Sequence, residues 1–327
     1  MTLTRRQMLA LSGASLASAG LVSPALSFAA DPLQRLEGRA FATDWAITLP
    51  SGQDIEALRP AIEMRLAEID RMMSPWRLDS EVTGFNLAKA GSCPVSSETA
   101  LVAAAALETA EASAGWFDPT VGPLLARWGF GPIKGDAAEV SHWQMLGTEP
   151  ELLIKAEDGL TLDLCGIAKG WAMDRMAGIV AAAGHENFLI DIGGELLGRG
   201  LHPEGRAWQV AIEDPRPGAA GMAAALQLDG RAVATSGYSL QSFRLGDTTY
   251  SHIVDPHHMS PVAGQIASVS VLADTGMHAD AWATALLAAG AEGPDLARKT
   301  GLATLFLIPG PDGLQQIATG GFDRAIL

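Results

Sequence analysis

The sequence DLCGIAKGWAMD, Asp163–Asp174, joins a glycine-rich turn to the start of a helix and carries one lysine. We expect a strand over Leu160–Leu164 and a helix over Ala168–Ala183. Gly166 lets the backbone turn tightly and approach a ligand. The first amides and the dipole of the helix favour an anion, and Lys169 adds positive charge. The pattern therefore indicates either a phosphate site or an ordinary turn with a solvated lysine.

The segments on either side of this stretch predict an α+β fold. Strands cluster around a few helices without regular βαβ alternation, so we expect mixed or antiparallel sheets with packed helices. Leu152–Leu164 alternates around Asp158 and Gly159, which predicts a hairpin. The expected helices, besides the one above, are Ile55–Met73, Ser97–Ser113 and Ala279–Ala289. We expect a strand over Phe41–Leu49, further strands from Asn187 to the C-terminus, and loops over residues 74–86 and 115–131.

Residues 1–29 have the layout of an export signal. The pair Arg5–Arg6 follows Thr4, an uncharged run comes next, and small residues precede a cleavage site after Ala29. The pair favours the twin-arginine route, which carries folded proteins, over an ordinary secretory signal or an uncleaved anchor. The run is interrupted by glycines and Pro24 and is a poor permanent span. We therefore expect a periplasmic protein with one domain over residues 30–327.

Composition excludes one class of partner and leaves the cysteines open. The formal net charge is −15, so the chain is not expected to bind nucleic acid through a general basic field. There are two cysteines, Cys93 and Cys165, which do not make a disulfide framework. Cys165 lies in the glycine-rich turn, where we expect a small buried side chain. Whether the two cysteines pair is left open.

A second candidate site lies in HADAWATALL, His278–Leu287. Asp280 and Thr284 are four residues apart and share one face of the expected helix. A carboxylate and a hydroxyl are hard oxygen ligands that suit Mg²⁺ or Ca²⁺, and the carbonyl of Ala283 could complete part of the shell. The alternative is an aspartate that favours the helix dipole beside a packed threonine.

Two further segments carry polar side chains at the ends of strands. ATSGYS offers Thr235, Ser236 and Gly237, which can hold a phosphate or form a simple turn. SHIVDPHHMSP contains three histidines whose spacing fits no zinc motif. There His252, beside Asp255, could act as a general base, or the segment could be a surface loop.

Loop aromatics form the last candidate group. Trp76 and the pair Trp116–Phe117 lie in predicted loops and not on helical stripes. Such rings often stack on flat ligands, although they also often cover a core. Asp118 next to them could bind a ligand ring or cap the next turn.

The order of these segments resembles the ApbE family. The matching segments run from about Phe41 to the C-terminus. They are FATDW, SPWRLDSEVTGFN, GWFDPTVGPLLARWGFG, DLCGIAKGWAMDR, IDIGGEL, ATSGYS, HIVDP and DAWATAL. The resemblance implies an FAD:protein FMN transferase that uses FAD and a divalent cation, Mg²⁺ or Ca²⁺. A threonine or serine hydroxyl of an acceptor protein attacks the FMN phosphorus, FMN becomes a phosphoester, and AMP leaves.

The resemblance also implies a role for each matching position. His252 or Asp255 takes the proton of the acceptor hydroxyl. The metal is held by the backbone of Gly166, by Asp280 and Thr284, and by the nearby carbonyl of Ala283. The residues implied in cofactor binding are Phe41, Trp76, Trp116, Phe117, Asp118, Asp163, Lys169, Thr235, Ser236, Gly237 and Ile253.

Some positions depart from the family pattern. Tyr238 stands where an acidic residue is common, Phe41 and Trp76 are bulkier than usual, and Cys165 replaces a smaller residue. These departures concern the shape of the adenine or flavin pocket and not the metal site. The twin-arginine signal is similar to that of the NosX branch, which implies flavinylation of the membrane protein NosR for nitrous oxide reductase maturation. Two alternatives stay open: an FAD pyrophosphatase that gives FMN and AMP, and a periplasmic flavin-binding protein without catalysis.

Overall fold

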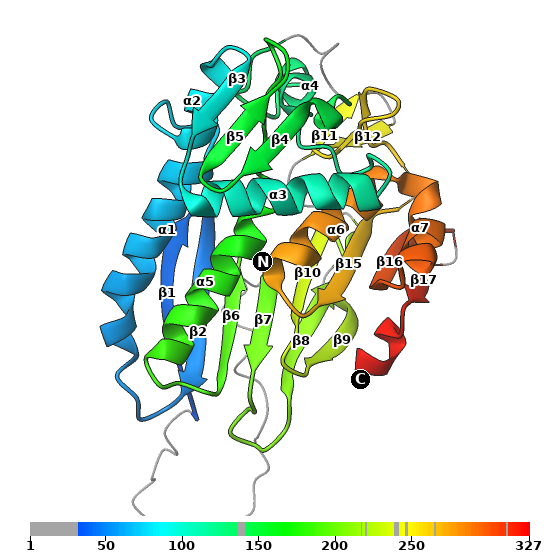
Figure 1. The fold of residues 1–327 in the computed structure, drawn as a ribbon. Helices are drawn as coiled ribbons and strands as arrows, with labels where there is room; N and C mark the ends of the chain where they lie inside the picture. Colours follow the sequence, from blue (N-terminus) through cyan, green and yellow to red (C-terminus); the bar gives the residue numbers. More distant parts are fainter. Residues whose placement is uncertain are drawn as a thin grey trace, which may run out of the picture. The chain divides into compact units, whose positions relative to one another are not determined.

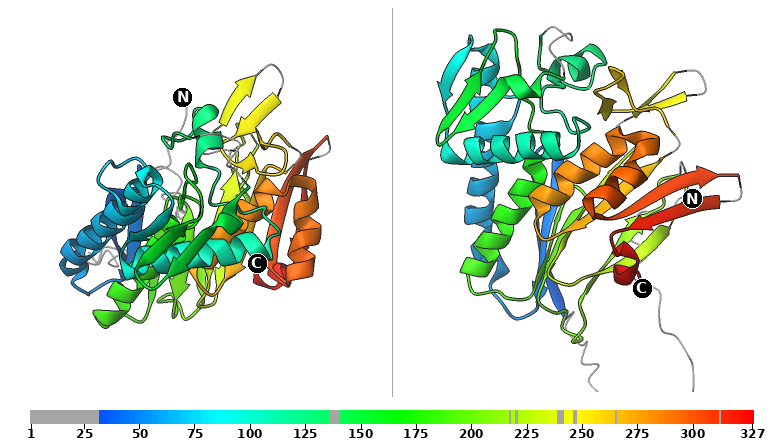
Figure 2. Two further views of the ribbon diagram at one scale, coloured as in Figure 1. Left: turned by 45° about the horizontal axis from the view of Figure 1, so that its top comes forward. Right: turned by 45° about the vertical axis from the view of Figure 1, so that its right-hand side comes forward.

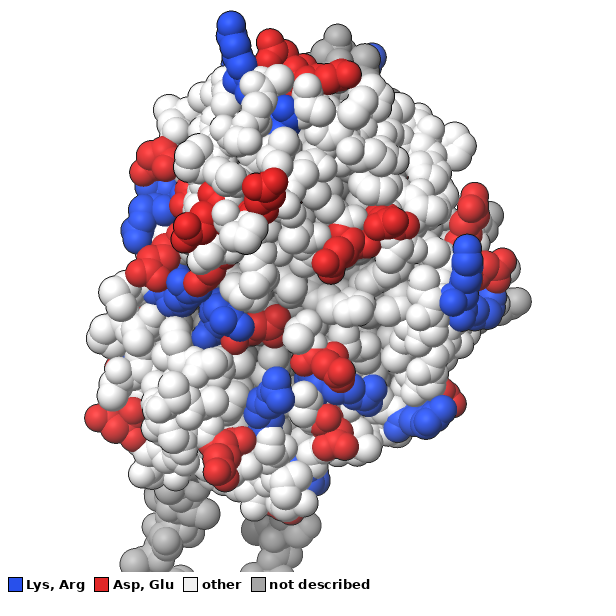
Figure 3. Space-filling model, in the orientation of Figure 1, with Lys and Arg blue, Asp and Glu red and all other residues white. Residues whose placement is uncertain are grey.

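The computed structural model describes residues 32–327 except 136–140, 217, 220, 239–241, 246–247, 265 and 312. The proposed export signal, residues 1–29, lies outside the described residues. Residues 32–327 form one compact unit. None of the described helices is long and apolar enough to cross a membrane. On the face seen in Figure 3, acidic and basic side chains are interspersed.

An eight-stranded antiparallel sheet is the centre of the described unit (Figure 1). Its spatial order is β1-β2-β6-β7-β10-β15-β16-β17, so β7 lies beside β10 although a separate hairpin intervenes in the chain. Leu36, Ile47 and Ile190 point from it into the main core, which matches the period of two in their strands. The strands are β1 Leu33–Ala40, β2 Thr43–Pro50, β6 Phe188–Ile192, β7 Glu195–Arg199, β10 Ala232–Gly237, β15 Ser268–Ala273, β16 Ala303–Gly310 and β17 Gly313–Thr319.

Three helices pack on one face of this sheet (Figures 1 and 2). They are α1 (Arg59–Met73), α5 (Ala168–Ala182) and α6 (Gly276–Ala288), and α1 follows the short turn η1 (Ile55–Leu58). α5 packs between α1 and α6, and both α5 and α6 contact β7. α7 (Gly293–Thr300) packs against α6 near the end of the chain. The buried face of α6 is built from alanines and leucines, which lets the helix lie close to the sheet.

A second, three-stranded sheet lies beyond α3 (Ser97–Ala112). α3 contacts both this sheet and α6, so it lies between the sheet and the helix layer. The strand order of the small sheet is β3-β5-β4, and α2 precedes it in the chain. The bounds are α2 Glu81–Leu87, β3 Gly91–Pro94, η3 Trp143–Met145, β4 Leu146–Glu149 and β5 Leu152–Lys155.

The other face of the large sheet carries the β8–β9 hairpin and the C-terminal turn η5. β8 (Trp208–Glu213) and β9 (Met222–Leu228) pair antiparallel, and their inward side chains form a second core with Phe322 of η5 (Phe322–Ala325). The proline- and glycine-rich stretch between β8 and β9 is therefore a hairpin connection. Smaller pairs complete the fold: β11 Ser242–Leu245 with β12 Thr248–Ser251, and β13 Val254–Asp255 with β14 Ser260–Pro261.

The predicted strand over Leu160–Leu164, and with it the hairpin over Leu152–Leu164, is wrong. β5 ends at Lys155 and pairs with β3 and β4, while residues 160–164 belong to no described strand. Asn86 takes the backbone groups of Leu162 instead: its amide donates to the Leu162 carbonyl at 3.0 Å, and its oxygen accepts from the Leu162 amide at 2.7 Å. A side chain thus replaces the strand ladder that the alternating pattern predicted.

Two predicted loops contain short helices. Residues 74–86 include most of α2, which begins after Ser80, whose hydroxyl accepts from the Thr83 amide at 3.0 Å. Residues 115–131 include α4 (Gly122–Arg127), with a proline in its first turn. The other corrections concern single residues. Phe41 lies in the β1–β2 turn at φ 51° and not in a strand, and Cys165 is exposed, not buried. Both cysteines are free.

Candidate functional site

The N-terminal ends of α5 and α6 are joined by two aspartates. Oδ2 of Asp280 accepts a hydrogen bond from the Gly170 amide at 2.9 Å. In return, the carboxylate of Asp174 accepts from the amides of Gly276 at 2.7 Å and Met277 at 3.0 Å, at the start of α6. Each helix thus supplies a carboxylate to the unpaired amides of the other, which fixes the first turns of both against each other.

The approach of the two helices depends on glycine. A Cβ atom on Gly170 would lie 2.2 Å from the carbonyl oxygen of Gly276 and 2.8 Å from Cβ of Asp280. Only hydrogen atoms fit at this crossing, so the predicted phosphate-binding turn and the predicted metal ligand are brought to one place.

Lys169 lies between two buried carboxylates. Its ammonium contacts Oε1 of Glu195, and its Nζ lies 4.0 Å from Oδ1 of Asp280. The side chains of Glu195 and Asp280 are 4% and 6% exposed, whereas that of Lys169 is 34% exposed. Sequence reasoning missed Glu195. The available signal was its position directly after two glycines in IDIGGEL, where a hairpin turn places the first residue of the next strand.

Gly166, Phe117 and Thr284 meet beside this cluster. A Cβ atom on Gly166 would lie 3.2 Å from the Phe117 ring and 3.2 Å from Oγ1 of Thr284. Asp163 is tied to the same region, because its amide donates to the Pro119 carbonyl at 2.7 Å and its Oδ1 accepts from the Cys165 amide at 2.9 Å. The structure therefore brings the backbone of the glycine-rich turn, one aromatic residue and the predicted threonine together.

Burial raises the pKa of two aspartates at this site, Asp280 and Asp163. It raises the pKa of Asp280 above its ordinary value, and the Lys169 ammonium and the Gly170 amide oppose that rise. Burial likewise raises the pKa of Asp163, against the hydrogen bond from the Cys165 amide. A cation that binds at Asp280 would favour its ionised form and so offset the burial.

The residues at Asp280 fit a hard divalent cation. Oδ2 is bonded to the Gly170 amide, so Oδ1 is the oxygen left to face a ligand, and the Thr284 hydroxyl lies next to the Gly166 backbone. One carboxylate with a hydroxyl and backbone carbonyls is an all-oxygen set that suits Mg²⁺ or Ca²⁺. No group of three or more His, Cys, Asp or Glu side chains in the described part of the chain is placed to bind a metal. The donor set thus favours a cation whose coordination shell is completed by substrate oxygens or by water.

His252 lies in the bend between β12 and β13. Its ring is edge-on to Phe130, with 6.4 Å between the ring centroids. Asp255 is engaged elsewhere: it accepts from the amides of His257 at 2.9 Å and His258 at 3.0 Å, and its Oδ2 lies 2.7 Å from Nδ1 of His258. These contacts give Asp255 the role of a turn cap. Ile253, next to His252, is partly buried against the main core.

The segment Trp116–Asp118 is buried and internally braced. The Trp116 ring lies over His257 at a centroid distance of 4.0 Å and a tilt of 30°. Asp118 accepts from the amide and hydroxyl of Thr120 at 2.7 and 2.6 Å and from the Ser141 amide at 2.7 Å. In this structure Asp118 therefore acts as a cap.

The remaining predicted cofactor residues lie in separate segments. Trp76 is in the loop before α2 and is 66% exposed, so its ring is open to a ligand. Thr235 lies in β10, where its hydroxyl is 2.8 Å from that of Ser270 in β15. Ser236 and Gly237 complete β10. Phe41 packs partly against the main core from the β1–β2 turn.

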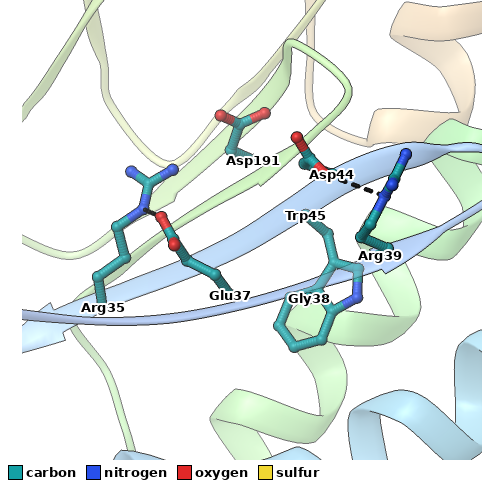
Figure 4. A pocket seen from close by; sticks show the side chains of 7 residues that line it. All are labelled: Arg35, Glu37, Gly38, Arg39, Asp44, Trp45 and Asp191. Atoms are coloured by element: carbon teal, nitrogen blue, oxygen red, sulfur yellow. Dashed lines mark hydrogen bonds and ion pairs between the residues drawn. The ribbon is translucent and has the colours of Figure 1, made fainter. Parts of the chain in front are cut away.

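A hollow of about 380 Å³ lies on the face of β1, β2 and β6 away from the helices (Figure 4). Four of its charged side chains form pairs, Arg35 with Glu37 at 2.6 Å and Arg39 with Asp44 at 3.2 Å. None of the predicted site residues lines it. The hollow is therefore separate from the cluster around Lys169.

Known proteins resemble the chain in sequence and in fold. The family profile described as ApbE family matches residues 41–306. An FAD:protein FMN transferase of Vibrio cholerae serotype O1 is 32% identical over 289 residues, which cover 84% of this chain and 86% of that protein. One of Klebsiella pneumoniae (strain 342) is 30% identical over 299 residues, 86% of this chain and 85% of that protein.

Two solved structures share the fold. The flavin transferase ApbE from Vibrio cholerae has a TM-score of 0.79 and 31% identity, over 90% of this chain and 99% of that chain. The apo form of Pseudomonas stutzeri flavinyl transferase ApbE has a TM-score of 0.80 and 31% identity, over 90% of this chain and 96% of that chain. The expected α+β fold with antiparallel sheets is confirmed.

Proposed function

Because the chain belongs to the ApbE family, we propose that it is an FAD:protein FMN transferase. It moves FMN from FAD to a threonine or serine hydroxyl of an acceptor protein as a phosphoester, and AMP leaves. The observation that carries this proposal is the meeting of Lys169, Asp280, Thr284 and the Gly166 backbone where α5 begins against α6. A positive charge, helix-end amides and hard oxygen donors suit a pyrophosphate and its cation.

Each residue of the cluster has a task in this reaction. Lys169 binds a pyrophosphate oxygen, and its charge offsets the negative charge that grows as the phosphorus is attacked. Asp280 and Thr284, with the carbonyls of Gly166 and Ala283, would hold Mg²⁺. When bound, the ion supplies positive charge to the phosphate oxygens. The glycine-rich turn lets the backbone approach the phosphates closely.

His252 is the proposed base. The acceptor O–H bond breaks, its proton passes to a ring nitrogen of His252, and the new O–P bond forms as the bond to AMP breaks. Phe117 and Asp163 beside Gly166, with Phe41, Trp76 and Ile253, are the proposed flavin and adenine contacts.

We also propose where the enzyme works. The twin-arginine signal over residues 1–29 would export the folded enzyme to the periplasm, where it would modify a membrane-associated flavoprotein. The resemblance to the NosX branch suggests NosR as that acceptor. The second candidate activity is hydrolysis of FAD to FMN and AMP, in which water replaces the acceptor hydroxyl at the same site.

Intact mass spectrometry of the acceptor tests the proposal. The protein without residues 1–29 is incubated with FAD, Mg²⁺ and an acceptor domain that carries a flavinylation threonine. A mass increase of one FMN, lost with Asp280→Ala and with the acceptor threonine changed to valine, is expected. AMP without an adduct would indicate the hydrolase. The absence of both the adduct and AMP would contradict catalysis altogether. A NosR domain that stays unmodified while another acceptor is labelled would overturn the NosR assignment.

A further inference from the structure

Glu195 occupies a buried position that none of the proposed catalytic steps uses. It is the first residue of β7, directly after the turn formed by Gly193 at φ 65° and Gly194 at φ 95°. Its side chain points to the face of the sheet that α5 and α6 cover, and the residue is 3% exposed. A carboxylate in such a place needs a partner, because burial of an unpaired charge is costly.

Only one of the two oxygens of this carboxylate has a polar partner among the described residues. Oε1 contacts the Lys169 ammonium, whereas Oε2 is buried without a hydrogen-bond partner among the described residues. The same ammonium lies 4.0 Å from Oδ1 of Asp280, which is too far for a hydrogen bond. Lys169 is therefore held by one of its two buried acidic neighbours and kept at a distance from the other.

This unequal sharing matters for the proposed metal site. Oδ1 is the Asp280 oxygen that remains for a cation, since Oδ2 accepts from the Gly170 amide. A lysine in direct contact with Oδ1 would compete with a divalent cation for that oxygen and would repel it. A buried ion pair between Lys169 and Asp280 would also have to break before the cation could bind.

We propose that Glu195 is a positioning residue that anchors Lys169 and so keeps Oδ1 of Asp280 open for the divalent cation. The inference rests on the proposed function, since it assumes that Asp280 is a metal ligand. Glu195 acts on the metal only through Lys169. Its removal should therefore weaken metal binding only as long as the lysine is present.

The test measures Mn²⁺ binding by electron paramagnetic resonance in the full mature chain without FAD or acceptor. Glu195→Gln keeps the size of the side chain and removes its charge, which frees Lys169 to move to Asp280. We expect Mn²⁺ affinity to fall about 10- to 100-fold, the usual effect of losing a partner next to a metal ligand. Glu195→Asp keeps the charge and is expected to retain most of the affinity.

The decisive variant is the pair Glu195→Gln with Lys169→Met. If Glu195 acts through Lys169, the pair binds Mn²⁺ as tightly as Lys169→Met alone. The control is Asp191→Asn, on the same β6–β7 hairpin: Asp191 accepts from the Gly194 amide at 3.0 Å but faces the hollow on the other side of the sheet (Figure 4). It should leave Mn²⁺ affinity unchanged, because it loosens the hairpin without touching Lys169.

Three results would overturn the inference. They are an unchanged Mn²⁺ affinity in Glu195→Gln, a full loss of affinity that persists in the pair, and an equal loss in Asp191→Asn. FMN transfer is scored separately in the wild-type protein, so failure of the proposed function is distinguishable from failure of the Glu195 assignment. Thermal unfolding of each variant checks that it is folded, and if Glu195→Gln does not fold, Glu195→Ala with and without Lys169→Met replaces it.

Discussion

The Gly170 amide donates a hydrogen bond to Oδ2 of Asp280 across 110 residues of sequence, at 2.9 Å. This bond joins the first turn of α5 to Asp280 in the second turn of α6. It leaves Oδ1 as the Asp280 oxygen for the proposed cation, and it depends on a helix crossing with no room for a side chain at Gly170. A single substitution at Gly170 can therefore test whether this contact holds the site together.

Gly170→Ala should damage both the fold and the site. Its Cβ would lie 2.2 Å from the Gly276 carbonyl oxygen, so the helices must separate, at a cost of about 1–3 kcal/mol in the free energy of unfolding. Urea denaturation measures that cost, and Mn²⁺ affinity should fall in the same variant. Gly178→Ala is the matched control, since nothing lies within 4 Å of its added Cβ and α5 should gain up to about 1 kcal/mol. Equal effects at both positions would contradict the close crossing.

His252→Ala should slow FMN transfer by roughly 10²–10⁴-fold and leave FAD bound, because the acceptor hydroxyl loses its base. Transfer rates from intact mass spectrometry and FAD affinity from flavin fluorescence measure the two effects. His258→Ala is the control, since that side chain is 74% exposed and contacts Asp255. If Asp255 were the base, Asp255→Asn would abolish transfer while His252→Ala spared it.

The raised pKa of Asp118 predicts that its contribution to stability falls as the pH rises. Burial raises its pKa, against the opposing hydrogen bonds from Thr120 and Ser141. The folded chain then keeps this proton to a higher pH than the unfolded chain. The contribution of Asp118 to the free energy of unfolding therefore falls as the pH rises from about 4 through the raised pKa. Asp118→Asn removes the carboxyl group and therefore removes this titration. The wild-type value minus the variant value, from urea titrations, should decrease between about pH 4 and pH 7, and an increase would contradict the raised pKa.

Lys155 should stabilise the small sheet as a buried cap of α2. Its ammonium donates to the carbonyls of Phe85 at 2.9 Å, Asn86 at 3.4 Å and Ala88 at 3.0 Å. Lys155→Met leaves these oxygens without their donor, and we expect a loss of about 1–3 kcal/mol in urea denaturation. Lys89→Met removes an exposed lysine nearby and should stay within about 0.5 kcal/mol of wild type. An unchanged free energy of unfolding in Lys155→Met would show that other donors reach the α2 carbonyls.

Local sequence signals predicted the long helices well. The alanine-rich pattern predicted a helix over Ser97–Ser113, and α3 spans Ser97–Ala112; the expected helix at Ala168 ends one residue early. Short elements were missed where a specific contact decides the structure. α2 depends on its Ser80 cap, and the extended segment at Leu162 depends on Asn86, 76 residues away. Alternation alone cannot distinguish a strand partner from a side-chain amide.

The candidate site was predicted in its parts but not in its connections. Lys169, Asp280 and Thr284 each stood out by residue type and spacing, and the structure brings them to one helix crossing. Glu195 did not stand out, because a glutamate at the start of a strand usually faces solvent. Its burial depends on the direction in which the β6–β7 turn places it, and that direction follows from the paired sheet.

The separation of Gly170 and Asp280 also sets a time order during synthesis. The chain up to Gly170 leaves the ribosome with its glycine-rich turn complete, but Asp280, which closes the site, follows 110 residues later. At ordinary elongation rates that interval is roughly 5–20 s. A nascent or truncated chain that ends before Asp280 therefore carries only part of the candidate site. The candidate site is therefore completed late in translation, once the helix that carries Asp280 and Thr284 has been made.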